Sequence, residues 1–217
     1  MVFQYGTWFG RATGVRRVLA LLAFALLGQP RDALAHHMIG GDLPRNFLEG
    51  FLSGLAHPII GLDHFVFILA AGLIAAKVAR GKTLPVVFLG ASLAGCVVHL
   101  AGLTVTGGEI VVAISIVGVG TFLVADKRVR PSLLMTGFAL AGAFHGYAYG
   151  ESIVGAEPAP LAAYLMGLIV IQYAVAMGAF TAARQFDGRS WLQRDSAMRA
   201  AGVVVCMAGA VALALAI

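Results

Sequence analysis

Charged residues are scarce in this sequence. Aspartate, glutamate, lysine and arginine make up only 12% of its 217 residues, while hydrophobic residues make up 60%. Soluble domains carry about twice that share of charge. The mean hydropathy of +0.91 agrees with this imbalance. The composition excludes an ordinary soluble enzyme and predicts an integral membrane protein.

Cysteine is also rare, and the common nucleotide-binding signature is absent. Cys96 and Cys206 stand singly in apolar runs with no CxxC spacing, so neither thiolate capture of a metal nor a disulfide is expected. No GxxxxGK[ST] loop offers an ATP site. The net charge of +5 comes from short clusters of Lys and Arg between apolar runs, which are typical topogenic signals. A nucleic-acid partner is therefore not expected.

The beginning of the chain has the pattern of a secretory signal peptide. Three arginines precede a short apolar run at 18–28, and Ala33-Leu34-Ala35 fits a cleavage site. The alternative is an uncleaved first membrane helix. We therefore expect residues 1–35 to be removed and residues 36–217 to form a single transmembrane domain.

Six later stretches are long enough to cross about 30 Å of hydrocarbon. They lie at about 58–79, 85–106, 109–125, 131–149, 159–184 and 195–217. The predicted fold class is an all-α integral membrane protein, a six-transmembrane-helix bundle after a cleaved N-terminal signal peptide. Ten basic residues fall in alternate loops: Lys77, Arg80, Lys82, Lys127, Arg128, Arg130, Arg184, Arg189, Arg194 and Arg199. The positive-inside rule then places both ends of the mature chain on the outer, periplasmic side of a bacterial-type inner membrane, as a multi-pass protein.

Histidine and carboxylate side chains gather in the outward half of the predicted spans. Imidazole favours Zn, Cu, Fe and Ni, so the group predicts a site for a divalent transition metal ion. Its members are His57, Asp63 and His64 in "HPIIGLDH", His99 in the second span, His145 and Glu151 at the end of the fourth, and His36 and His37 at the start of the mature chain. Pro58 and Gly61 leave open whether the helix through the first motif is continuous or broken.

Structural explanations also exist for single members of this group. His57 before Pro58 would suit a helix start, His99 would suit an interhelical hydrogen bond, and His36 and His37 would suit a disordered end. The inner half of the spans offers only five polar side chains, Ser92, Ser115, Thr121, Thr136 and Gln172. Without an acidic or histidine relay there, a proton-coupled antiporter is not favoured. The series Gly142-x-x-x-Gly146-x-x-x-Gly150 predicts close packing of the fourth span against another helix.

The motifs "HPIIGLDH" and "FHGYAYGE" (144–151) resemble those of the HupE/UreJ family of membrane proteins, and the resemblance spans the mature chain. That family is associated with hydrogenase and urease operons and is regarded as nickel or cobalt permeases. The resemblance implies that His57, Asp63 and His64 are essential for transport, and that His145 and Glu151 belong to the second motif.

The second motif departs from the family pattern HGxAHGxE. Tyr149 stands where a second histidine is common, and Glu151 comes one position early. A phenol, with a pKa of about 10, is a weaker ligand than imidazole near neutral pH. We therefore expect the metal preference or affinity to differ from that of other members.

The expected function is a permease for Ni²⁺ or Co²⁺, with Zn²⁺ and Cu²⁺ ranked behind them and the ion as substrate. A membrane potential favours inward movement of two charges by about 4.6 kcal/mol per 100 mV, so uptake needs no ATP. The resemblance implies a functional link to a nickel or cobalt enzyme, and a homo-oligomer is left open. Two alternatives remain: an intramembrane zinc-dependent hydrolase, which needs a lipid-sized cleft near His64, and a metal-binding receptor without flux.

Overall fold

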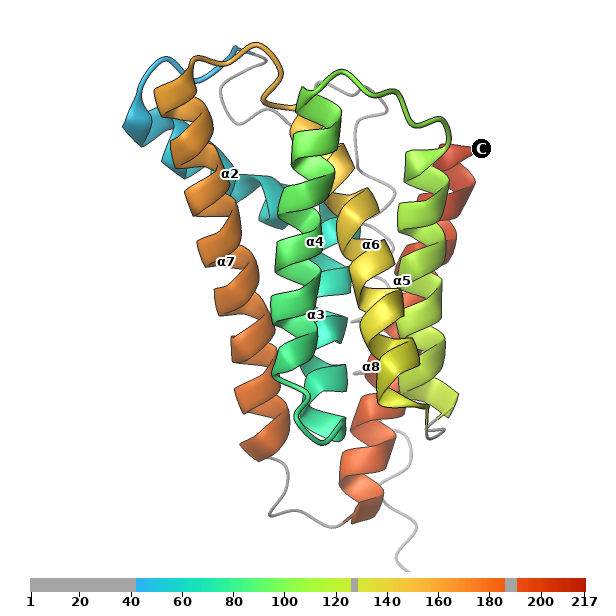
Figure 1. Ribbon diagram of the computed structural model, residues 1–217. Coiled ribbons are helices and arrows are strands. Elements are labelled where there is room, and N and C mark those ends of the chain that lie inside the picture. The colour runs from blue at the N-terminus through green and yellow to red at the C-terminus, as the bar shows by residue number, and fades with distance from the viewer. Residues whose placement is uncertain (1–41, 126–128, 186–190) are drawn as a thin grey trace, which may run out of the picture. The chain divides into compact units, whose positions relative to one another are not determined.

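Helix is the only regular secondary structure in residues 42–125, 129–185 and 191–217, which the computed structural model describes, without the side chains of 191–194. These residues belong to one compact unit, 36–217. Its helices are α2 (Phe47–Ile60), α3 (Leu62–Lys77), α4 (Thr83–Leu100), α5 (Gly108–Ala125), α6 (Pro131–Glu151), α7 (Pro158–Gln185) and α8 (Trp191–Ala216) (Figure 1). The all-α prediction is confirmed. The predicted signal peptide, His36 and His37 lie outside the described residues.

Four helices are individually long and apolar enough to cross a membrane: α4, α5, α7 and the part of α8 from Asp195 to Ala216. They match four of the predicted spans. The pair α2 and α3 makes a fifth candidate if it is counted as one span with a bend of 80°. Helix α6 matches the predicted span 131–149 in position, but it carries His145 and two buried or half-buried tyrosines in its second half. Within the described residues, length and composition therefore give four or five spans, against the six predicted.

The predicted first span, 58–79, has the wrong beginning. Helix α2 starts at Phe47, where Asn46 caps it by accepting a hydrogen bond from the backbone N–H of Glu49. The Glu49 carboxylate in turn accepts from the backbone N–H of Arg45 and from the Asn46 amide. This capping box fixes the helix start. The helix then ends at Ile60, since Pro58 interrupts its hydrogen-bond ladder and Gly61 adopts an extended backbone.

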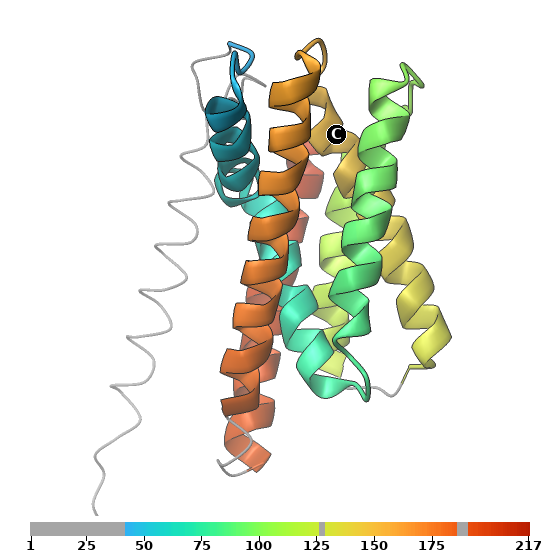
Figure 2. The same ribbon diagram turned by 60° about the vertical axis from the view of Figure 1, so that its left-hand side comes forward.

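Glycine allows three pairs of helices to approach closely. In each pair, α2 with α7, α4 with α6, and α5 with α8, a glycine Cα lies against the backbone of its partner helix. Added Cβ atoms would overlap the Tyr164 carbonyl at Gly54, the Ser92 carbonyl at Gly146, and the backbone N and Sγ of Cys206 at Gly120. Figure 2 shows α2 beside α7 and α4 beside α6. The close packing predicted for the 142–150 series is confirmed, with α4 as the partner.

The helix ends separate basic from acidic residues, as the alternate-loop pattern predicted. The α3–α4 turn, the start of α6 and the start of α8 lie at one end of this unit (Figure 1). The described basic residues there include Arg80, Lys82 and Arg130, all exposed. Glu151 and Glu157 lie at the opposite end, in the α6–α7 connection, as does the end of α8.

Candidate metal centre

Three helices bring His57, His64 and His145 together. His57 is in the last turn of α2, His64 is in the first turn of α3, and His145 is on α6. The ring centroids of His64 and His145 are 5.0 Å apart, and those of His57 and His64 are 6.1 Å apart. Seven residues of continuous helix would separate His57 and His64 by about 10.5 Å along the axis. The break at Gly61 therefore places the two histidines side by side.

All three histidines are buried. Their exposed fractions are 5% for His57, 4% for His64 and 0% for His145. Burying a polar ring is costly unless it finds partners, so such residues need a structural or functional reason. The contacts of His145 supply part of that reason.

A chain of hydrogen bonds fixes the proton of His145. The Ser115 hydroxyl on α5 donates to the backbone carbonyl of Val112 at 2.6 Å, so its oxygen is left to accept from His145 Nε2 at 3.0 Å. With its hydrogen on Nε2, neutral His145 has a lone pair on Nδ1. That nitrogen lies 2.9 Å from Nδ1 of His64, which therefore donates. Ser115 sets the tautomer in the way that second-shell partners orient metal-binding histidines.

Asp63 adds a carboxylate at the edge of this group. Its Oδ2 lies 4.0 Å from Nε2 of His64, and its side chain is 32% exposed. Gly61 leaves room for both residues, because a Cβ there would come within 2.8 Å of His64 Cδ2 and 3.2 Å of Asp63 Oδ1. The loop of the first motif thus combines a helix break with a fully packed arrangement of His64 and Asp63.

Tyr149 completes the wall around the histidines. It follows His145 by one helical turn, and its ring lies 4.4 Å from that of His64 and 5.3 Å from that of His57. The backbone carbonyl of Tyr149 accepts hydrogen bonds from the hydroxyls of Tyr164 at 2.9 Å and Ser152 at 3.0 Å. Its own hydroxyl is buried and has no hydrogen-bond partner among the described residues. A buried hydroxyl in that state costs about 1 to 3 kcal/mol.

Aromatic rings close the histidine group on the side of the basic loops. Phe67, one turn beyond His64, stacks on Phe88 of α4 at 4.9 Å and lies 4.5 Å from the His145 ring. Phe138, two turns before His145 on α6, lies 5.9 Å from Phe67. We call Phe67, Phe88 and Phe138 the phenylalanine layer. All three are at most 3% exposed and belong to a larger apolar core that continues toward the basic end.

The other predicted site residues lie elsewhere. His99 is half-buried on α4, where its ring contacts Tyr147 at 4.4 Å and Gly150 packs against its Cβ. Glu151 is exposed at the end of α6. His36 and His37 lie outside the described residues. Among the described members, only His57, Asp63, His64 and His145 are therefore brought together.

Two residues of this group were not predicted as part of it. Ser115, expected in a separate inner half, belongs with the histidines through its bond to His145. The spacing gave a usable signal, since Ser115 is only seven residues after the start of α5. Tyr149 was recognised only as a departure from a motif, whereas its ring contacts show that it belongs to the group.

The histidines do not form a complete metal-ligand set in this structure. No three His, Cys, Asp or Glu side chains in the described ranges are arranged to hold one ion together. The Nδ1 atoms of His64 and His145 face each other across one shared hydrogen. A metal ion bound by both Nδ1 atoms would require that hydrogen to move to Nε2 of His64, and His57 and Asp63 are the neighbouring side chains that would supply a further ligand. The donor set of imidazole and carboxylate fits a borderline divalent ion.

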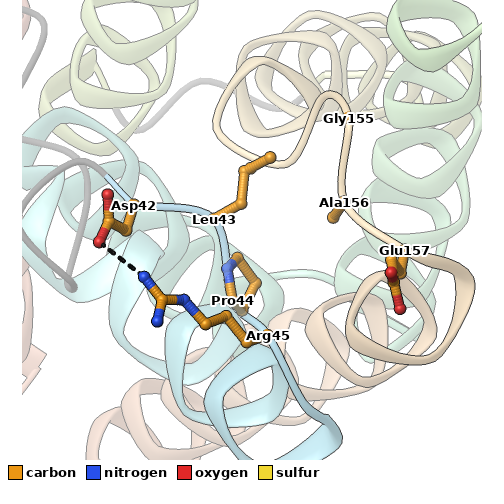
Figure 3. A pocket seen from close by; sticks show the side chains of 7 residues that line it. All are labelled: Asp42, Leu43, Pro44, Arg45, Gly155, Ala156 and Glu157. Atoms are coloured by element: carbon orange, nitrogen blue, oxygen red, sulfur yellow. Dashed lines mark hydrogen bonds and ion pairs between the residues drawn. The ribbon is translucent and has the colours of Figure 1, made fainter.

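A separate cavity opens at the acidic end of this unit. It has a volume of about 360 Å³ and is lined by residues 42–45, before α2, and 155–157, before α7. Asp42 and Arg45 form an ion pair at 3.4 Å on its rim, and Leu43 extends toward the α6–α7 connection (Figure 3). None of the three histidines lines this cavity.

The chain is similar to known proteins over most of its length. Residues 22–212 match the family model described as HupE / UreJ protein. The chain is 25% identical over 194 residues to Protein HupE of Rhizobium leguminosarum bv. viciae, and the alignment covers 87% of this chain and 94% of that protein. No solved structure matches the chain. With a match that spans most of its length, this multi-pass membrane protein belongs to the HupE/UreJ family.

Proposed function

We propose that this protein is a permease for a divalent transition metal ion, Ni²⁺ or Co²⁺, that takes up its substrate under the membrane potential. The observation that carries the proposal is the convergence of His57, His64 and His145 from three helices at a helix break inside a membrane protein. Buried ionisable residues at membrane depth generally mark an ion pathway. The resemblance described above supports nickel or cobalt as the substrate.

Binding uses the histidine group and Asp63. The hydrogen on His64 Nδ1 moves to Nε2 of the same ring, which faces Asp63 at 4.0 Å, so the Nδ1 lone pairs of His64 and His145 both bind the ion. Ser115 keeps the His145 proton on Nε2. His57 and Asp63 supply the remaining contacts, since both lie next to His64. The Asp63 carboxylate offsets part of the charge that the ion brings into the protein.

The acidic end of the unit provides the approach to this site. Glu151 is exposed there and His99 is half-buried near the end of α4. We assign both residues, with His36 and His37, to the collection of ions before they reach His64. A carboxylate-rich mouth raises the local concentration of cations.

Passage to the basic end requires the phenylalanine layer to open. Phe67, Phe88 and Phe138 lie directly beyond the histidines and are at most 3% exposed. The broken helix α2–α3 runs through this barrier. His57 and His64 lie before Phe67 along the chain, on the side of the histidines, and α3 continues beyond Phe67. Helix breaks at substrate sites are a recurrent feature of transporters that alternate between two open states.

Topology and processing follow from the same proposal. We propose that α6 and the α2–α3 pair also cross the membrane, which gives the six spans predicted from sequence. Residues 1–35 are then a cleaved signal peptide, and the single domain 36–217 has both ends outside. The described basic residues at the opposite end support this orientation.

The burial of the site favours a permease over an intramembrane zinc-dependent hydrolase. A hydrolase must admit a lipid or peptide to a metal-bound water. His145 and Tyr149 are fully buried, and His57 and His64 are at most 5% exposed. Such a site suits a small ion that enters without a bulky substrate.

The experiment that tests the proposal is metal influx into proteoliposomes with an imposed inside-negative potential. We would compare Ni²⁺, Co²⁺, Zn²⁺ and Cu²⁺ for the native protein, His64→Ala and His99→Ala. We expect potential-dependent Ni²⁺ or Co²⁺ influx that His64→Ala abolishes and His99→Ala only reduces, because His99 is outside the histidine group. Gly137→Ala is the matched control, since the space around Gly137 is open.

Two results would contradict the proposal. Tight metal binding with no flux of any ion would indicate a receptor. Flux that His64→Ala leaves unchanged would place the pathway elsewhere in the protein.

A further inference from the structure

Tyr149 has contacts that its packing role does not explain. Its ring lies against both His64 and His57, at 4.4 Å and 5.3 Å, so it contacts two of the three histidines. The side chain is 0% exposed, yet its hydroxyl has no hydrogen-bond partner among the described residues. Phenylalanine would fill the same space without burying that polar atom. An unsatisfied buried hydroxyl in a native protein needs an explanation, and a water molecule carried by a bound ion would supply its partner.

The surrounding network holds the backbone of Tyr149 in place. The Tyr149 carbonyl accepts from Tyr164 and Ser152, whose hydroxyls are also within 3.0 Å of each other. Tyr164 belongs to α7 and is 0% exposed. The network therefore ties the end of α6 to α7 and restricts where the Tyr149 ring lies. A side chain that binds a ligand benefits from such support, because less freedom is lost on binding.

The chemistry of a phenol decides what kind of contact it makes. With an ordinary pKa of about 10, tyrosine enters the site as a neutral group. Its hydroxyl is a hydrogen-bond donor and acceptor, and a poorer direct ligand than imidazole. A metal-bound water molecule is a strong hydrogen-bond donor, and the Tyr149 hydroxyl oxygen accepts from it. A fully dehydrated ion held by imidazoles alone would gain little from the Tyr149 hydroxyl.

The separation of His64 and His145 changes less on binding a six-coordinate ion than on binding a tetrahedral one. Two nitrogens bound at about 2.1 Å to one ion are about 3.0 Å apart at a right angle and about 3.4 Å apart at the tetrahedral angle. The two Nδ1 atoms are 2.9 Å apart. When both rings rotate toward one ion, this distance changes little if the N–metal–N angle is a right angle. Right angles belong to six-coordinate ions, whereas Zn²⁺ in closed protein sites is tetrahedral.

We propose that Tyr149 is a specificity-determining residue, whose hydroxyl holds a water molecule on a six-coordinate divalent ion and so favours Ni²⁺ and Co²⁺ over Zn²⁺. This inference rests on the proposed function, because it assigns the ion to the His64–His145 site. It adds to that proposal the contact between the Tyr149 hydroxyl and the ion's water molecule, and the selection of six-coordinate ions. The phenol thereby limits the number of imidazoles that can surround the ion.

The test is metal binding by the purified full-length protein in detergent, with Ni²⁺, Co²⁺ and Zn²⁺ measured separately by calorimetry. We expect Tyr149→Phe to weaken Ni²⁺ and Co²⁺ binding about tenfold and to leave Zn²⁺ binding unchanged. Tyr149→His is expected to strengthen Zn²⁺ binding more than Ni²⁺ binding, because it adds an imidazole. Tyr173→Phe, at a 46% exposed position on α7, makes the same chemical change away from the site.

A second readout keeps the test independent of folding. Tyr149→Phe without metal is expected to melt at or above the temperature of the native protein, since it removes an unsatisfied hydroxyl, and to gain less from added Ni²⁺. Equal Ni²⁺, Co²⁺ and Zn²⁺ affinities in Tyr149→Phe and the native protein would overturn the inference alone. Failure of the native protein to bind any of these ions would instead overturn the proposed function.

Discussion

Replacing Ser115 with alanine removes the group that fixes the tautomer of His145. The native hydroxyl accepts from His145 Nε2 at 3.0 Å, at a histidine that is 0% exposed. Without it, the buried N–H lacks an acceptor, which costs about 1 to 3 kcal/mol of stability. The proton is then free to move to Nδ1, where it blocks the lone pair that faces His64. Loss of such a second-shell partner lowers metal affinity about 10- to 100-fold.

Calorimetric titration of the detergent-purified protein with Ni²⁺, alongside thermal unfolding, measures both effects. Ser115→Thr retains a hydroxyl at this position and is expected to restore most of the affinity. Thr181→Ala is a matched control, because that exposed hydroxyl donates only to the Gly178 carbonyl of its own helix. The reasoning is refuted if Ser115→Ala folds and binds Ni²⁺ as tightly as the native protein.

Three further substitutions test other parts of the structure. Gly61→Ala places a methyl group 2.8 Å from His64 Cδ2, so it is expected to weaken Ni²⁺ binding about tenfold while circular dichroism shows intact helices; unchanged binding would mean that the loop relaxes freely. The methyl group of Gly146→Ala overlaps the Ser92 carbonyl, so this variant is expected to lose roughly 3 kcal/mol of stability. Its control, Gly137→Ala, lies in open space on the same helix and is expected to gain about 0.5 to 1 kcal/mol. Equal melting temperatures of the two variants would contradict the packing of α4 on α6. Phe67→Ala opens the phenylalanine layer, and its proteoliposomes are expected to leak metal ions even when His64→Ala is added; a tight double variant would show that the layer is not the barrier.

Sequence patterns predicted the helices well where one physical effect dominated. Apolar runs of spanning length located α4, α5, α7 and α8, because only continuous burial in lipid or protein accounts for such stretches. Helix α2 was missed because its 14 residues are too few to cross a membrane alone. The Asn46–Glu49 capping box was a readable local signal for its beginning. The sequence left the break at Gly61 open, since Pro58 alone is compatible with a helix that continues.

The sequence indicated His57, Asp63, His64 and His145 as members of one group, but not the geometry of that group and not Ser115 or Tyr149 as parts of it. Shared depth predicted that His57, His64 and His145 would meet. Depth does not give the rotation of a helix about its axis, so His99, which faces Tyr147 and Gly150, was grouped with them. Helix rotation depends on packing partners far away in sequence, such as the contact of Gly150 with His99. The role of Ser115 needed the three-dimensional structure, because its bond to His145 joins residues 30 positions apart.

The hydrogen-bond chain around His145 bears on whether protons leak across a membrane through this protein. Protons cross proteins by hopping along connected donors and acceptors, and a row of buried histidines would ordinarily invite such leakage. Here the chain runs from His64 through His145 and Ser115 and stops at the Val112 carbonyl, which has no hydrogen to pass on. Phe67 and Phe88 interrupt any continuation beyond His145. Along these hydrogen bonds a proton therefore cannot pass beyond Ser115, because the Val112 carbonyl has none to exchange.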